Sequence, residues 1–212
     1  MAIPPFGLEG MLALPAGCRA VIIFAHGSGS SRHSPRNKLV AAALQQACFG
    51  TLLFDLLAEN EATSRDNIFD IELLAERLTM ATHWLGLRME RLAPRIGYFG
   101  ASTGAAAALV AAAQPDSQVG AIVSRGGRPD LAGAALSRVT APTLLIVGSL
   151  DRDVLALNRQ AMAHMRCQTR LQVIPGATHL FEEPGAIGHV IGHASVWFSH
   201  HLLQSEVADV SG

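Results

Sequence analysis

Short apolar runs recur along the chain, and each is bounded by glycine, proline or polar residues typical of turns. Six of these runs occupy residues 19–27, 50–57, 95–100, 119–127, 141–149 and 170–176. Their apolarity is nearly continuous rather than alternating, which is typical of strands covered on both faces of a parallel sheet. We therefore predict six buried parallel strands.

Longer segments with the apolar spacing of helices separate these runs. They cover residues 38–47, 70–84, 103–113, 152–165 and roughly 184–203, while residues 7–15 are a candidate antiparallel edge strand. The alternation of strands and helices predicts right-handed crossovers and a doubly wound, mostly parallel α/β sheet. Binding sites in such sheets lie beyond the carboxyl ends of the strands, so we expect the chemistry in the loops at that edge.

Length and composition indicate one globular domain spanning residues 1–212, because 50% of the residues are hydrophobic and only 16% are charged. A chain of this size buries roughly 70% of the surface that it exposes when unfolded. The formal net charge is −1, and no long run of lysine or arginine occurs. This charge balance argues against nucleic acid as a partner, because binding to phosphates needs a basic face.

The cysteines and the N-terminal stretch indicate in which cellular compartment the protein is expected. Cys18, Cys48 and Cys167 are widely spaced and form no C-x-x-C pair, as expected for reduced thiols in a cytoplasmic protein. The N-terminal stretch has no basic region and is interrupted by prolines, so we expect no secretory signal. No apolar stretch reaches ~18 residues without a charge or a turn residue, so we expect no membrane span.

A serine stands between two glycines where one predicted strand meets a helix. The stretch from Gly100 to Gly104, "GASTG", fits the pattern G-x-S-x-G. In this context the pattern favours a sharp turn that holds the Ser102 hydroxyl above the edge of the sheet as a nucleophile. The alternative is a small serine that only fills a tight turn.

A serine hydroxyl is a weak nucleophile and needs a base that a carboxylate holds in place. The chain supplies both, because Asp151 follows the strand at 141–149 and His179 follows the strand at 170–176. Asp153 competes with Asp151, although it also suits the N-cap of the next helix. For His179 the alternative is an ordinary histidine in a surface loop.

The loop at residues 24–37 is rich in glycine and serine, and its backbone N–H groups can face the site. We predict that the N–H groups of Ser28 and Thr103 hold the negative charge that develops on the attacked carbonyl oxygen. His26 is interpreted as a tie that fixes this loop rather than as a second base.

Arg125 follows another predicted strand at the same edge. Its guanidinium is a candidate for binding a substrate carboxylate, and the alternative is a local ion pair with an acid such as Asp130. His189 and His193 have the i, i+4 spacing of metal ligands, but no third ligand is evident, so we interpret them as histidines on a helix surface and predict no metal site.

Together, "HGSGSSRHSPRN", "GASTG", "SRGGRPDLA", "VGSLDRDV" and "PGATHLF" make residues 21–181 resemble the α/β-hydrolases, and more narrowly the small dienelactone hydrolase-like group. The resemblance implies an α/β-hydrolase fold, hydrolysis of ester-like bonds without metal or organic cofactor, and a triad of Ser102, Asp151 and His179. Dienelactone hydrolase itself is associated with a cysteine nucleophile, so its lactone substrate is not carried over. The chain is too short for a folded lid, which predicts a minimal fold with an exposed, shallow site.

The sequence thus predicts a serine-dependent carboxylic ester hydrolase that acts on a small-molecule ester through an acyl-enzyme. Two alternatives stay open. An acyltransferase or a peptidase would use the same triad, because pocket shape selects the acceptor. A binding protein on the same fold would have an inactive site, because a fold alone does not guarantee chemistry.

Overall fold

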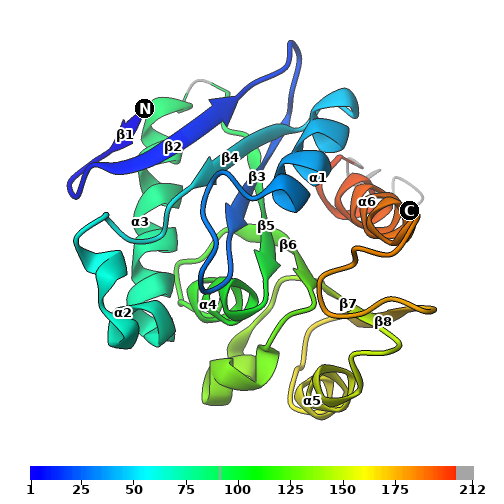
Figure 1. Ribbon diagram of the computed structural model, residues 1–212. Helices are drawn as coiled ribbons and strands as arrows, with labels where there is room; N and C mark the ends of the chain where they lie inside the picture. The colour runs from blue at the N-terminus through cyan, green and yellow to red at the C-terminus, as the bar shows by residue number, and fades with distance from the viewer. Residues whose placement is uncertain (91, 204–212) are drawn as a thin grey trace, which may run out of the picture.

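The computed structural model describes residues 1–90 and 92–203, which form one eight-stranded sheet with the order β1-β2-β4-β3-β5-β6-β7-β8 (Figure 1). The strands are β1 (Ala2–Ile3), β2 (Leu8–Ala13), β3 (Ala20–Ala25), β4 (Gly50–Phe54), β5 (Arg95–Ala101), β6 (Val119–Arg125), β7 (Thr143–Gly148) and β8 (Thr169–Ile174). The strands from β4 to β8 are mutually parallel, and β2 runs antiparallel to β4. The six predicted strands and the antiparallel strand near the N-terminus are confirmed, whereas β1, which pairs outside β2, was not predicted.

Helices cover both faces of the sheet, as in a doubly wound fold. Figure 1 shows α1 and α6 on one face and α3, α4 and α5 on the other. The helical elements are α1 (Pro35–Gln46), η1 (Glu61–Thr63), α2 (Arg65–Phe69), α3 (Ile71–Arg88), α4 (Thr103–Ala112), η2 (Pro129–Arg138), α5 (Arg152–Met162), α6 (Ala186–Phe198) and η3 (Ser199–Leu203). Among the described residues, no helix is long and apolar enough to cross a membrane.

All five predicted helices form, and the short elements η1, α2 and η2 are additions that the apolar pattern did not indicate. Helix α1 begins three residues before its predicted start. The Ser34 side chain accepts a hydrogen bond from the Asn37 N–H, and Pro35 occupies the first turn. Both features favour a helix start at this point because the first N–H groups of a helix have no partner within it.

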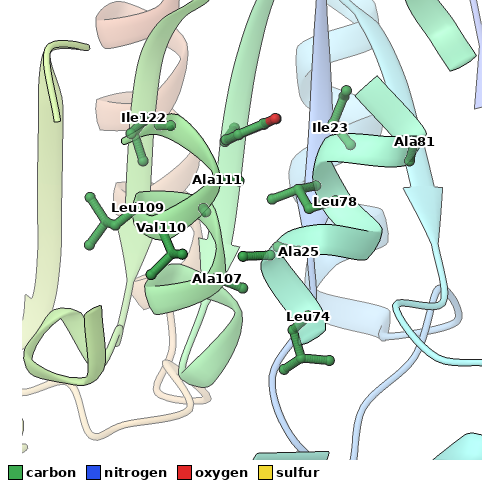
Figure 2. Close-up of a cluster of buried hydrophobic side chains, with 14 of the residues drawn as sticks. Ile23, Ala25, Leu74, Leu78, Ala81, Ala107, Leu109, Val110, Ala111 and Ile122 are labelled. Atoms are coloured by element: carbon green, nitrogen blue, oxygen red, sulfur yellow. The ribbon is translucent and has the colours of Figure 1, made fainter. Parts of the chain in front are cut away.

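The apolar side chains of the strands contribute to two separate core layers, one on each face of the sheet. Along β3, alternate residues point to opposite faces: Val21 and Ile23 join the layer under α3 and α4, whereas Ile22 and Phe24 join the layer under α1 and α6. Figure 2 shows the first layer, where α3 and α4 pack on the sheet (Leu74, Leu78, Ala81, Ala107, Val110 and Ala111 against Ile23, Ala25 and Ile122). The fold class predicted from the sequence is therefore confirmed.

Helix α4 lies in the centre of one of these layers, and every one of its ten residues is buried. It contacts α3, η2 and the strands β3, β5 and β6. Seven of its ten residues are alanine or glycine, and such small side chains let the helix approach its neighbours closely. The alanines and the glycine of α4 are thus explained by its close packing against neighbouring helices and strands.

We predict that Ala107→Leu lowers the free energy of unfolding by about 1–3 kcal/mol, because extra volume in a close-packed layer displaces its neighbours. Ala42→Leu on the exposed face of α1 is the matched control and should stay within about 0.5 kcal/mol of the wild type. Urea unfolding of both variants measures the difference. Equal stability of the two variants would contradict the packing of α4 described above.

Candidate active site

Ser102 occupies a strained turn between β5 and α4. Its backbone has φ 51° and ψ −123°, a conformation that residues other than glycine rarely adopt. Such strain costs on the order of 1–3 kcal/mol and persists only where the surroundings enforce it. The turn leaves Ser102 partly exposed at the carboxyl end of β5.

The two glycines of the turn are required by close backbone contacts. A Cβ atom on Gly100 would lie 2.4 Å from the Cα of Ala105, and one on Gly104 would lie 2.2 Å from the carbonyl oxygen of Ala25. These neighbours are backbone atoms of a helix and a central strand, so they cannot move aside without disturbing the fold. The pattern G-x-S-x-G is therefore explained by geometry at both glycine positions.

The predicted acid and base are in direct contact. His179 Nδ1 lies 2.6 Å from Asp151 Oδ2, and the Asp151 side chain is only 14% exposed. Nδ1–H donates to the carboxylate, which leaves Nε2 as the nitrogen available to accept a proton. Asp151 stands at the N-cap of α5 without a capping bond from its side chain, while Asp153 is exposed in the first turn of that helix. The structure thus pairs His179 with Asp151 and not with Asp153.

Two hydrogen bonds join the loops that carry these two residues. The Gly176 N–H donates to Ser149 Oγ at 2.8 Å, and the Leu150 N–H donates to the Ala177 carbonyl at 3.0 Å. A Cβ atom on Gly148 would lie 2.2 Å from the same Ala177 oxygen, so the loops after β7 and β8 run in contact. This contact holds the carboxylate against the imidazole.

The segment that follows β6 lies between Ser102 and His179. The Arg128 N–H donates to the Ser102 carbonyl at 3.1 Å, and a Cβ atom on Gly126 would lie 3.1 Å from the His179 carbonyl oxygen. Within the described part of the chain, no hydrogen bond joins Ser102 Oγ directly to His179. The structure therefore places Asp151 and His179 in contact, and Ser102 at the end of β5, which β6 separates from β7.

One predicted oxyanion donor already has a partner. The Ser28 N–H donates to Thr103 Oγ1 at 2.9 Å, an interaction that the sequence reasoning did not foresee. Thr103 is buried at the first position of α4, where backbone N–H groups lack a partner within the helix. This bond ties the loop after β3 to the start of α4, and the oxyanion role of both N–H groups stays a prediction.

Comparison with known proteins assigns the chain to a family. The family model "Dienelactone hydrolase family" matches residues 8–197. The chain belongs to the dienelactone hydrolase family. This assignment supports a hydrolase, and the α/β-hydrolase fold and the resemblance inferred from the motifs are confirmed.

Solved structures of this family and of its wider fold superpose closely. A dienelactone hydrolase from Anabaena variabilis is 52% identical, with a TM-score of 0.91 over 95% of each chain. Est1E from Butyrivibrio proteoclasticus has a TM-score of 0.80 over 96% of this chain and 99% of its own, but only 14% identity. At this low identity, the similarity to Est1E shows the fold alone.

A curated relative from Mycobacterium tuberculosis has a different kind of name. It is provisionally named a phosphoribosyl transferase and is 56% identical over 198 residues. The match covers 93% of this chain and 45% of the relative, so the chain spans about half the length of the curated relatives it matches. The name thus describes a much longer protein.

In this dienelactone hydrolase-family chain, His26 ties the loop after β3 to the chain after β4. The Leu56 N–H donates to His26 Nε2 at 3.1 Å, and Nδ1 lies 3.0 Å from the Gly27 carbonyl oxygen. Burial lowers the pKa of His26, with smaller opposing effects from the Gly27 hydrogen bond and from Asp55. The neutral ring therefore fixes the loop, and its interpretation as a structural tie is confirmed.

A cavity of about 680 Å³ opens beside the same loop. It lies beyond the carboxyl ends of β3 and β4 and is walled by the chain that carries η1 and α2. Arg32 lines it and is bonded to both Asp55 and Glu9. The sequence predicted an exposed, shallow site and did not predict this cavity. The residues that line it come from segments that are distant in the sequence and meet only in the folded chain.

The structure excludes the pair with Asp130 that was one of the two sequence-based interpretations of Arg125. Asp130 is bonded to Arg128 through both carboxylate oxygens, at 2.9 and 2.8 Å. The proposed pair of Arg125 with Asp130 is therefore wrong. The physical reason is local: Arg128 lies two residues from Asp130, whereas the Arg125 side chain points to Asn37.

We predict that His26→Ala lowers the free energy of unfolding by about 1–3 kcal/mol at pH 7.5, because the Leu56 N–H loses its acceptor. The pKa of His26 is lower in the folded protein than its ordinary value of about 6.5, so the unfolded chain binds more protons on the acid side. Wild-type stability therefore falls as the pH drops below about 6.5, and the difference between the two proteins should narrow toward pH 5.5.

Denaturant unfolding at both pH values measures this effect, with His83→Ala on the exposed side of α3 as the control. The control should keep the pH dependence of the wild type. A difference between wild type and His26→Ala that stays constant from pH 7.5 to 5.5 would contradict the lowered pKa of His26.

Proposed function

We propose that the chain is a serine hydrolase that cleaves carboxylic esters, with Ser102 as nucleophile, His179 as base and Asp151 as the acid that orients it. The contact of 2.6 Å between His179 and Asp151 carries this proposal, because it leaves Nε2 free to take a proton. The strained turn at Ser102 supports it independently. Membership of the dienelactone hydrolase family supports the broader class of hydrolases.

In the proposed reaction, His179 Nε2 takes the Ser102 proton as the serine oxygen attacks the ester carbonyl carbon. Asp151 stabilises the imidazolium that forms. The tetrahedral intermediate collapses to an acyl-enzyme, and the alcohol leaves with the proton from His179. A water molecule then attacks the acyl carbon, gives its proton to His179 and releases the acid and the Ser102 hydroxyl.

The negative oxygen of the intermediate is assigned to the N–H groups of Thr103 and Ser28. The Thr103 N–H stands at the start of α4, where the helix dipole favours negative charge. The Ser28 N–H donates to Thr103 Oγ1 before substrate binds, so it shares or exchanges that bond when the oxyanion forms. The Thr103 hydroxyl is thereby proposed to hold the Ser28 donor in position.

The cavity beside Ser28 is the proposed place for one arm of the ester. Its volume of about 680 Å³ lies in the range of small-molecule sites. Apolar side chains form much of its wall (Leu56, Leu57, Ala58, Ala62, Ile68 and Leu74). Of its charged residues, Arg32 is bonded to Asp55 and Glu9, and Glu59 is exposed. These features favour an apolar arm rather than a charged one in this cavity.

Labelling with a fluorophosphonate probe tests the proposed nucleophile. The probe should modify Ser102 in the wild type, and peptide mass spectrometry should find no label in Ser102→Ala. Labelling without hydrolysis of any p-nitrophenyl ester would favour an acyltransferase or a peptidase. Absence of label on Ser102 would favour a binding protein and overturn the proposal.

Two aspartate variants test the acid. Asp151→Asn should lower kcat for p-nitrophenyl acetate by on the order of 10²–10⁴-fold, because an amide at this position no longer holds the correct imidazole tautomer. Asp153→Asn is the matched control, two residues away and exposed, and should stay within about 2-fold of the wild type. Similar losses in both variants would refute the assignment of Asp151.

Filling the cavity tests its proposed role. Ala62→Trp places a large side chain in the cavity wall and should lower kcat/KM for p-nitrophenyl octanoate at least 10-fold, with p-nitrophenyl acetate changed by less than about 3-fold. Ala163→Trp, on the exposed end of α5, is the control and should change neither value. If Ala62→Trp affects both esters equally, or neither, the cavity does not hold the acyl arm.

A further inference from the structure

The loop between β8 and α6 carries His179, and two unfavourable features follow the histidine within four residues (Figure 1). Phe181 has φ 56°, a left-handed backbone conformation that is rare for a bulky residue, and its side chain is only 2% exposed. The Oε2 atom of Glu183 is buried and has no hydrogen-bond partner among the described residues. Strained backbone and unsatisfied buried polar atoms are costly, and proteins retain them mainly at functional sites.

The other carboxylate oxygen of Glu183 accepts two hydrogen bonds from the residue that precedes the base. Thr178 donates to Glu183 Oε1 from its backbone N–H at 3.1 Å and from its hydroxyl at 2.5 Å. A hydroxyl at this distance from a carboxylate forms one of the stronger, charge-assisted hydrogen bonds. The bond from the Thr178 hydroxyl holds the pKa of Glu183 below its ordinary value, so the group is a carboxylate at neutral pH. Glu183 thereby closes a ring of chain that contains His179.

The part of the loop that carries the base has few other attachments. Ala177 and Phe181 are buried and anchor its two ends, whereas Thr178 and Leu180 are exposed and His179 is partly exposed. Among the described residues, Asp151 and Glu183 are the only side chains that form hydrogen bonds with the segment between the two anchors. The backbone beside the base therefore depends on Glu183.

The position of the His179 backbone matters because the imidazole has little room. A Cβ atom on Gly126 would lie 3.5 Å from His179 Cε1 and 3.1 Å from the His179 carbonyl oxygen, so the residue packs against the segment after β6. Proton transfer also requires Nε2 to meet the hydroxyl of Ser102 at hydrogen-bonding distance. A displacement of about 1 Å in such a geometry can slow a reaction on the order of 100-fold.

We propose that Glu183 is a positioning residue, which acts through Thr178 to fix the backbone that carries His179 and so aligns Nε2 with Ser102. The inference rests on the proposed function. Asp151 bonds to the imidazole and sets its tautomer, whereas Glu183 bonds to Thr178 and sets the place from which the imidazole extends. Two carboxylates then hold the base, one at its ring and one at its backbone.

Hydrolysis of p-nitrophenyl acetate tests this role. Glu183→Ala should lower kcat about 10-fold or more and change KM less than about 3-fold, because the base is displaced while the cavity beside Ser28 has no wall from this loop. Glu183→Gln should keep kcat within about 3-fold of the wild type, because its amide oxygen accepts the same two hydrogen bonds. Thr178→Val loses the hydroxyl but keeps the N–H, so its kcat should lie between those of the wild type and Glu183→Ala.

Glu182→Ala is the matched control, because Glu182 precedes Glu183 but bonds to Arg36 at 2.8 Å and not to the segment beside the base. Its kcat should stay within about 2-fold of the wild type, as for loss of an exposed ion pair. Urea unfolding of each variant separates positioning from stability. If folded Glu183→Ala keeps the kcat of the wild type, or if Glu183→Gln loses as much kcat as Glu183→Ala, the proposal is overturned.

Proton NMR tests the positioning apart from catalysis. The Nδ1–H that His179 donates to Asp151 should give a downfield signal at low temperature, which is identified by its absence in His179→Ala. The signal should persist in Glu183→Gln and Glu182→Ala and be lost or broadened in Glu183→Ala. If Glu183→Ala does not fold, Thr178→Val takes its place and should show a broadened signal. Loss of the signal in Glu183→Ala, with no ester hydrolysed by the wild type, would refute the proposed function alone. An unchanged signal in the folded variant would refute the role of Glu183.

Discussion

The close approach of helix α4 to the sheet is the constraint on which the candidate site depends. Gly104 leaves room for the carbonyl of Ala25, and Gly100 leaves room for the backbone of Ala105, so at these two positions the backbones of helix and strands meet directly. The turn that joins them then has no relaxed conformation available to Ser102, which takes φ 51°. The same approach brings the Thr103 hydroxyl within hydrogen-bonding distance of the Ser28 N–H. A larger residue at either glycine would therefore disturb the nucleophile and the loop opposite it together.

Much of this arrangement could be predicted because it depends on regular backbone structure. Parallel strands end at one edge, so Ser102, Asp151 and His179 were expected to gather there once their strands were identified. The contact between Asp151 and His179 bears out that expectation for two of them. What could not be predicted depends on side chains that the fold brings together from distant segments. The Thr103 hydroxyl meets Ser28 across 75 positions, and no local pattern indicates such a contact.

Local pairing explains the one prediction at this edge that failed. From the sequence, Asp130 was considered as a partner of Arg125, and Arg128, which lies two residues from it, was not considered. The strand geometry decides, because Arg125 is still part of β6 and its side chain lies on the face covered by α1, whereas Arg128 has passed the strand end and turns back on Asp130. The end of β6 thus separates two arginines only three residues apart.

Other arginines near the site show how the chain usually treats a partly buried guanidinium. Arg32 is bonded to Asp55 and Glu9, Arg77 to Glu61, and Arg128 to Asp130. Each pair neutralises a charge where solvent is partly excluded, which lowers the cost of desolvation. Among these and Arg125, only Arg125 has an amide oxygen in place of a carboxylate. The cost of burying the Arg125 guanidinium is therefore compensated less completely than the cost of burying the other three.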